Sequence, residues 1–148
     1  MSWEENLIED RQAIAEILKT SHTIAVLGME RDENPGRPAY SVPMFLKEHG
    51  YQIVPLPVKY PGVNEVAGMR AYHSLAEVPG DIDIVNVFRS PLDIPKHVDD
   101  ILAKKPKAVW FQSGIRHDAA AEKLARAGIK VVQDHCMKVE LIRLNRHR

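Results

Sequence analysis

The chain has 148 residues, a formal net charge of zero and one cysteine, with 45% hydrophobic and 27% charged residues. These values are ordinary for a soluble globular protein, and we expect residues 1–148 to form a single domain. The balanced charge argues against a nucleic-acid-binding protein whose affinity depends on neutralising phosphates. The chain starts without a signal peptide, and no apolar run approaches the ~20 residues that cross a bilayer. We therefore expect a cytoplasmic protein that binds neither nucleic acid nor membrane.

The first predicted element is a helix over residues 2–19. Ser2 and Glu5 have the spacing of a capping box, in which two side chains satisfy the free N–H groups of a helix start;. Apolar residues with helical spacing follow, from Leu7 to Leu18, and would form its buried side. The core of the fold is expected over residues 23–144.

Five short runs rich in β-branched residues come next. They are Thr23–Leu27, Tyr51–Pro55, Ile82–Phe88, Ala108–Phe111 and Ile129–Val132. Three are almost continuously apolar, which is typical of strands buried on both faces. The third run fits less well, because it contains Asp83 and Asn86. The centres of the runs lie roughly 20–30 residues apart, which is the length of a strand–helix–strand unit.

The segments between these runs are predicted to be helical. Helices are expected over Ser41–His49, Asp93–Lys104, His117–Ala127 and Met137–Asn145, with a very short helix at 74–77 and an extra strand around Met69–Tyr72. Gly50 and Gly128 have the position of glycines that end helices, and Asp93 has that of an N-cap. Alternating strands and helices predict an α/β protein with a doubly wound, Rossmann-like parallel sheet between two helical layers. Such sheets bind ligands beyond the carboxyl ends of their strands.

The loop after the first run lacks the dinucleotide-binding fingerprint. A Gly-x-Gly-x-x-Gly motif counted from Gly28 needs glycines where the chain has Glu30 and Glu33;. Two carboxylates there would face a pyrophosphate unfavourably. The second half of the loop suits an anion better, because Arg37 can pair with a phosphate and Ser41 can present a hydroxyl and free N–H groups at a helix start. An ordinary solvated loop is the alternative.

The next two loops offer further ligand contacts. After the second run, the stretch from Pro55 through Leu56 to Lys59 has no acid for a ribose hydroxyl, which NAD-binding domains usually have;. It offers an apolar wall for an adenine and a cation for a phosphate. Coenzyme A and NADP both carry a ribose phosphate, so this loop alone does not separate them. After the third run, Phe88 and Arg89 begin a turn in which the arginine is either part of a pocket wall or a surface charge.

The fourth run ends in two aromatic residues. Trp110 and Phe111 alternate across the strand, so only one of them is expected to face the ligand crevice. Gln112, Ser113 and the N–H groups around Gly114 could line a pantetheine arm.

The fifth loop brings His135 next to Cys136, which suggests a nucleophilic pair;. Neighbours on an extended chain point to opposite faces, so we favour a buried structural thiol. The histidines are dispersed without metal-ligand spacing, and there is neither a P-loop nor a nucleophile elbow. We predict no metal ligands and no catalytic residues.

Taken together and in order, the segments of the chain resemble the small stand-alone CoA-binding domain proteins. These are similar to the N-terminal CoA-binding part of the succinyl-CoA synthetase alpha subunit. The matching stretches are TIAVLG, RPAYSVPMFLKEHGYQIVPLP, SLAEVPGDIDIVNVFRSP, KAVWFQSGIRHDAAAEKLARAGIKVVQDHC and KVELIRL. The resemblance implies a protein that binds coenzyme A or acyl-CoA. It does not imply an enzyme, because the synthetase takes its phosphorylated histidine from a second domain.

The resemblance also implies which residues bind the cofactor. They are Gly28, Met29, Arg37, Pro38, Ser41, Pro55, Leu56, Lys59, Phe88, Arg89, Gln112, Ser113 and Gly114. The chain departs from relatives in reading Leu56-Pro57-Val58 where they tend to have Val-Asn-Pro. It also has His135 where they often have arginine, so a fixed cation becomes a titratable one and affinity could depend on pH. An NAD(P)-binding oxidoreductase and an interaction module with a vestigial pocket remain open as alternatives. The sequence also leaves open whether the protein forms a homodimer, as small domains of this type commonly do.

Overall fold

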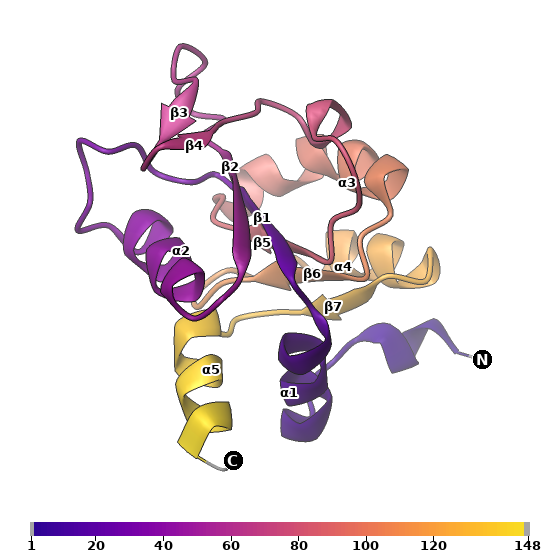
Figure 1. Ribbon diagram of the computed structural model, residues 1–148. Helices are drawn as coiled ribbons and strands as arrows, with labels where there is room; N and C mark the ends of the chain where they lie inside the picture. The colour runs from indigo at the N-terminus through magenta and orange to yellow at the C-terminus, as the bar shows by residue number, and fades with distance from the viewer. Residues whose placement is uncertain (1, 147–148) are drawn as a thin grey trace.

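The computed structural model describes residues 2–146 and contains a sheet of five parallel strands (Figure 1). The strands are β1 (Thr23–Leu27), β2 (Gln52–Leu56), β5 (Ile84–Val87), β6 (Ala108–Phe111) and β7 (Lys130–Val132). They lie side by side in the order β2-β1-β5-β6-β7. Each strand overlaps one of the five predicted runs, and the predicted doubly wound parallel sheet is confirmed.

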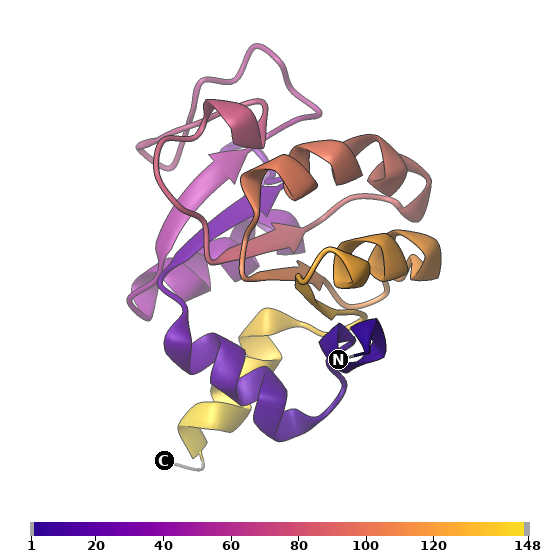
Figure 2. The ribbon, with the colours of Figure 1, turned by 90° about the vertical axis from the view of Figure 1, so that its right-hand side faces the viewer.

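Helices cover both faces of the sheet (Figures 1 and 2). One layer holds α1 (Arg11–Thr20), α2 (Pro38–Glu48) and α5 (Met137–Arg146). The other holds α3 (Val98–Lys104), α4 (Asp118–Arg126) and the 3-10 turn η2 (Leu75–Glu77). Successive residues of β1 alternate between two apolar cores: Ile24 and Val26 pack toward the first layer, and Ala25 and Leu27 toward the second;. No helix within residues 2–146 has the length and apolar character needed to cross a membrane.

The structure divides the helix predicted over residues 2–19 into two elements. Trp3–Asn6 form a 3-10 turn, η1, and α1 starts only after Asp10, whose carboxylate accepts a hydrogen bond from the Ala13 N–H at 3.0 Å. Between them the chain is extended, because Ile8 N–H donates to the Val131 carbonyl of β7 at 2.8 Å. β7 is an edge strand, and this contact covers the Val131 carbonyl on its free edge;.

The helix predicted from Asp93 starts differently. The turn η3 (Pro91–His97) precedes α3, and the Ser90 hydroxyl caps it by accepting from the Leu92 N–H at 3.4 Å. The expectation that Asp93 caps a helix is therefore wrong. Asp93 lies inside η3, where its carboxylate reaches Lys96 at 3.1 Å instead.

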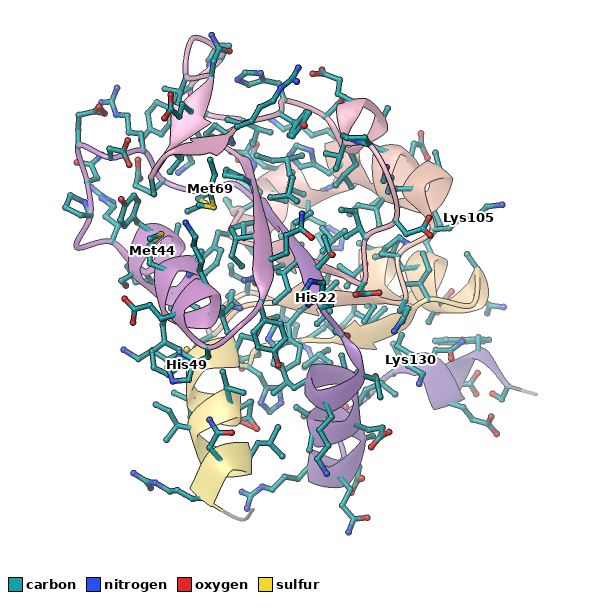
Figure 3. All side chains as sticks on the ribbon, viewed as in Figure 1. His22, Met44, His49, Met69, Lys105 and Lys130 are labelled. Atoms are coloured by element: carbon teal, nitrogen blue, oxygen red, sulfur yellow. The ribbon has the colours of Figure 1, made fainter. Side chains whose placement is uncertain are left out.

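A small hairpin stands beside the open edge of β2. Its strands are β3 (Glu65–Val66) and β4 (Met69–Arg70), so the extra strand predicted near residue 69 is confirmed. The Ala67 N–H of the hairpin donates to the Asp32 carboxylate in the loop after β1, at 2.9 Å. Figure 3 shows Met69 and Met44, from the hairpin and α2, in the region between these two elements. The hairpin thus links the β2 edge to the loop that follows β1.

Asp83 lies just before β5, and its side chain binds the start of the neighbouring strand β1. For this reason the third predicted run does not have a strand pattern at its start. Its carboxylate accepts from the N–H groups of His22 and Thr23, at 2.7 and 3.0 Å, and lies 3.5 Å from the Lys107 ammonium. Burial raises the pKa of Asp83, but these donors together hold it below its usual value of 3.8;.

Replacing this carboxylate, as in Asp83→Ala, is expected to lower the free energy of unfolding by about 1–2 kcal/mol at pH 7. Since the folded-state pKa is depressed, the contribution of Asp83 is complete above about pH 3.8 and is lost as the pH falls through the folded-state value;. Urea unfolding of both proteins from pH 7 to pH 3 measures this difference. A gap that stays constant down to pH 3 would contradict the assignment.

Candidate functional site

A pocket lies where the strand order reverses. The chain runs from β1 outward to β2 and then crosses back to β5 on the other side of β1. Doubly wound sheets bind ligands between the carboxyl ends of two such strands. An open pocket of about 300 Å³ lies there. Six of the predicted site residues line it: Gly28, Arg37, Pro38, Lys59, Phe88 and Arg89.

Gly28 allows the two strand ends to approach each other closely. Its φ is +92°, and a Cβ at this position would lie 2.3 Å from the Phe88 carbonyl oxygen and 3.0 Å from the Arg89 Cδ. Its N–H donates to the Leu56 carbonyl at 2.8 Å, and is therefore not available to a ligand. The glycine predicted to open a phosphate-binding turn thus serves to bring the Arg89 side chain over the end of β1.

Arg89 belongs to the wall of this pocket. Arg89 is only 7% exposed. The sequence left open whether this arginine is part of a pocket wall or a surface charge, and the second alternative is wrong. The guanidinium donates from Nε to the His97 Nε2 at 3.2 Å, and its Nη2 lies 3.7 Å from an Asp93 carboxylate oxygen. Arg37 and Lys59 are exposed at the rim of the same pocket. Three cationic side chains therefore surround one cavity, which suits an anion.

Glu30 also lines this pocket, but its carboxylate is hydrogen-bonded to the loop. The residue is 6% exposed. Its Oε1 accepts from the Arg31 N–H at 3.1 Å and from the Asn34 amide at 3.2 Å. Burial raises the pKa of Glu30, but hydrogen bonds from Tyr60, Asn34 and the Arg31 N–H, together with the nearby Arg37 guanidinium, hold it below 4.5;. Glu30 is therefore ionised at neutral pH and organises the loop after β1.

The Glu30→Gln variant is expected to flatten the acid dependence of stability. Since the folded-state pKa of Glu30 is depressed, the stability it provides is present above about pH 4.5 and is lost as the pH falls through the folded-state value;. Urea unfolding between pH 6 and pH 3 should show a shallower decline in Glu30→Gln than in the wild type. Glu33→Gln, at an exposed neighbour, is the control and should follow the wild type. Equal declines in all three proteins would contradict this role.

Three other predicted site residues, which lie at the ends of β1 and β2, are not part of the pocket lining. Met29 and Leu56 are almost fully buried in the two apolar cores, and Pro55 is buried within β2. Leu56 still supports the site through its carbonyl, which accepts the Gly28 N–H.

Ser41 does not present a free N–H group. The helix α2 begins at Pro38, earlier than predicted, because proline suits the first helical position;. The Ser41 N–H consequently lies inside the first turn and donates to the Arg37 carbonyl at 2.9 Å. The expectation of a free N–H group at Ser41 is therefore wrong, while the role of its exposed hydroxyl stays a prediction.

The three predicted site residues that directly follow β6 lie outside the pocket lining as well. Gln112 is buried, and it donates to Asn86 Oδ1 at 2.6 Å and accepts from the Met137 N–H at 3.4 Å. Ser113 and Gly114 are exposed, and the Gly114 N–H is taken by the Asp134 carboxylate at 2.6 Å. The two aromatic residues of β6 are both fully buried, and they lie on opposite faces of the sheet as expected from their alternation; neither lines this pocket.

His135 and Cys136 do not form a pair of the kind a nucleophile needs. Cys136 is half-buried, less than predicted, and packs beside the core under α1, α2 and α5. The His135 Nδ1 lies 3.8 Å from a Glu140 carboxylate oxygen, and the residue is outside the pocket lining. Within residues 2–146, no three His, Cys, Asp or Glu side chains come together as a metal site.

The sequence reasoning missed several pocket residues: Ala39, Ser90, Ile115 and, as a lining residue, Glu30. It also missed the partners of Arg89. Arg89, Asp93 and His97 are spaced four residues apart, a spacing that brings side chains together on a helical segment;. This spacing is the feature of the sequence from which the two partners of Arg89 could have been predicted.

The fold and the site define a doubly wound α/β domain with a cationic pocket at its switch point. The chain belongs to the CoA-binding domain family, whose family model matches residues 22–142. The predicted resemblance is thereby confirmed.

The chain is also similar to individual proteins over most of its length. The chain is 36% identical over 126 residues to the Bacillus subtilis protein YneT, covering 85% of this chain and 90% of YneT. A Thermus thermophilus structure, cell-free ID.343, superposes with a TM-score of 0.85 and 41% identity, covering 92% of this chain and 99% of that one. A protein of Pyrococcus horikoshii OT3 has a TM-score of 0.85 and 33% identity, with 93% of each chain covered.

Proposed function

We propose that this protein binds coenzyme A or an acyl-CoA, with the phosphates of the cofactor in the pocket between β1 and β5. The observation that carries this proposal is the buried Arg89 guanidinium, which packs against Gly28 at the strand ends. A buried charge is costly unless it has partners. Among the residues that the structure describes, the partners of Arg89 are a neutral ring nitrogen and one carboxylate at 3.7 Å, which leave donors for an anion;.

The rim of the pocket supports a ligand with several phosphates. Arg37 and Lys59 approach from the loops after β1 and β2, while Arg89 approaches from the loop after β5. Coenzyme A carries a pyrophosphate and a separate 3′-phosphate. Cations that approach from different loops suit a ligand with phosphates at two places. At about 300 Å³, the pocket is at the small end for ligand sites, so we infer that it holds the phosphates and that the pantetheine arm extends along the surface;.

Isothermal titration with coenzyme A, dephospho-CoA, NAD and NADP tests this proposal. We expect binding of coenzyme A that weakens without the 3′-phosphate, and no binding of NAD. Binding of NAD or NADP in preference to coenzyme A would favour the oxidoreductase-type alternative. Failure of all four ligands would favour an interaction module with a vestigial pocket.

Lys59 is the residue that we assign to the 3′-phosphate. Lys59→Ala is expected to weaken coenzyme A binding about 5- to 10-fold while changing dephospho-CoA binding little, because one charged hydrogen bond is lost. Titration of both ligands measures the difference. Lys130→Ala is the matched control, since Lys130 is an exposed lysine at the opposite, amino edge of the sheet (Figure 3). Equal losses for the two ligands would assign Lys59 to another phosphate.

A further inference from the structure

His97 lies outside the pocket lining and, within residues 2–146, contacts the pocket through Arg89. It lies at the junction of η3 and α3, and its Nε2 accepts the hydrogen bond from Arg89 Nε at 3.2 Å. A ring nitrogen can accept only in the neutral imidazole, and then the proton is on Nδ1. The side chain that packs against Gly28 is thus hydrogen-bonded to a titratable residue outside the pocket lining.

The charged groups around His97 come from three elements. Arg89 faces it from the loop after β5, Asp93 and Lys96 from η3, and Asp100 from α3. Both acids are already engaged. The Asp93 carboxylate lies 3.1 Å from Lys96 and 3.7 Å from Arg89, while that of Asp100 accepts from the N–H groups of Leu75 and Ala76.

These surroundings favour the neutral imidazole. Burial lowers the pKa of His97, the positive charges of Arg89 and Lys96 lower it further, and Asp100 and Asp93 offset only part of this. The net pKa is below 6.5. The hydrogen bond from Arg89 is therefore formed at neutral pH.

We infer that His97 is a positioning residue, which holds Arg89 ready for an anionic ligand when neutral and releases it when protonated. This inference rests on the proposed function. Protonation converts the Nε2 acceptor into a donor and places a second positive charge beside the guanidinium. Arg89 then loses the partner that fixes its Nε, and the pocket loses an oriented donor. Affinity for phosphates should consequently fall as the pH drops through the pKa of His97, which lies below 6.5.

The first experiment measures coenzyme A affinity from pH 7.5 to pH 5.0 in three proteins. His97→Gln keeps an acceptor in a similar place but cannot become charged, whereas His22→Gln removes an exposed histidine at the amino end of β1 (Figure 3). The ligand phosphate itself titrates near a pKa of about 6, equally for all three. We expect the wild type and His22→Gln to lose about tenfold more affinity than His97→Gln over this range. Parallel profiles for all three proteins would overturn the inference.

A neutral-pH comparison separates positioning from general structure. His97 starts α3 without a side-chain capping hydrogen bond, so replacing it removes no cap. At pH 7.5, His97→Leu should weaken binding about 3- to 10-fold, and His97→Gln should restore most of the loss. Wild-type affinity in His97→Leu would contradict the inference. Thermal unfolding of each variant verifies that it is folded.

A second readout needs no ligand. In ¹H–¹⁵N spectra, the Arg89 Nε–H signal is identified by its loss in Arg89→Lys. We expect this signal to shift or broaden in the wild type as the pH falls through the lowered pKa of His97, and to remain unchanged in His97→Gln. A signal that does not change when His97 is protonated would overturn the hydrogen bond between Arg89 and His97 itself. If the signal behaves as expected but coenzyme A does not bind at any pH, the proposed function fails and the pairing stands.

Discussion

Replacing Arg89 with alanine is expected to weaken coenzyme A binding about 10- to 100-fold, which corresponds to losing one buried, charge-assisted set of hydrogen bonds. The effect should exceed that of Lys59→Ala, because Arg89 is 7% exposed while Lys59 is at the solvated rim;. Isothermal titration at pH 7.5 measures it. Dephospho-CoA should lose as much affinity as coenzyme A, since we assign Arg89 to the pyrophosphate.

Two variants control for this effect. Arg126→Ala removes an arginine from the last turn of α4, where it is exposed and pairs with Glu122, and should leave affinity unchanged. Arg89→Lys keeps the positive charge but loses the Nε–H that donates to His97, so we expect an intermediate loss;. Wild-type affinity in Arg89→Ala would remove Arg89 from the binding site.

The Gly28→Ala variant is expected to lower the free energy of unfolding by about 2–4 kcal/mol. Two effects add at this position. A φ of +92° strains any residue with a Cβ, and that Cβ would lie 2.3 Å from the backbone oxygen of Phe88;. Because the obstacle is backbone, relief requires β1 and β5 to separate at their carboxyl ends. Urea unfolding measures the stability loss, and titration should show that coenzyme A affinity falls with it.

Other glycines in the chain separate the two effects. Gly80 has a φ of +80° but open space around it, so Gly80→Ala should show the backbone strain alone, at about 1–2 kcal/mol;. Gly62 has neither feature, and Gly62→Ala should change stability by about 0.5 kcal/mol or less;. If Gly28→Ala were no more destabilising than Gly80→Ala, the close approach at the strand ends would not be the limiting contact.

The architecture was predictable because it rests on local patterns. The buried strands appear as short apolar runs, and two of them, Thr23–Leu27 and Ala108–Phe111, have the bounds of β1 and β6. Gly50 and Gly128 follow the ends of α2 and α4 with positive φ, as expected of residues that stop helices;. Strand–helix alternation then leaves a parallel sheet as the arrangement that buries all these runs. The carboxyl edge of this sheet, and hence the region of the candidate site, follows from the sequence alone.

The partners of individual side chains were decided by the tertiary structure. The N-terminal capping pattern predicts one helix, but pairing with Val131, far along the chain, holds the backbone extended. Gln112 has the right place for a ligand contact but is turned to Asn86 on the neighbouring strand. Glu30 was expected to repel a phosphate, yet donors from its own loop and from Tyr60 satisfy its charge. A residue's local pattern carries no information about groups that only the folded chain brings within hydrogen-bond distance. For this reason, the sequence determined the sheet and the edge at which the candidate site lies, whereas the fold decided which of the polar residues there face the pocket.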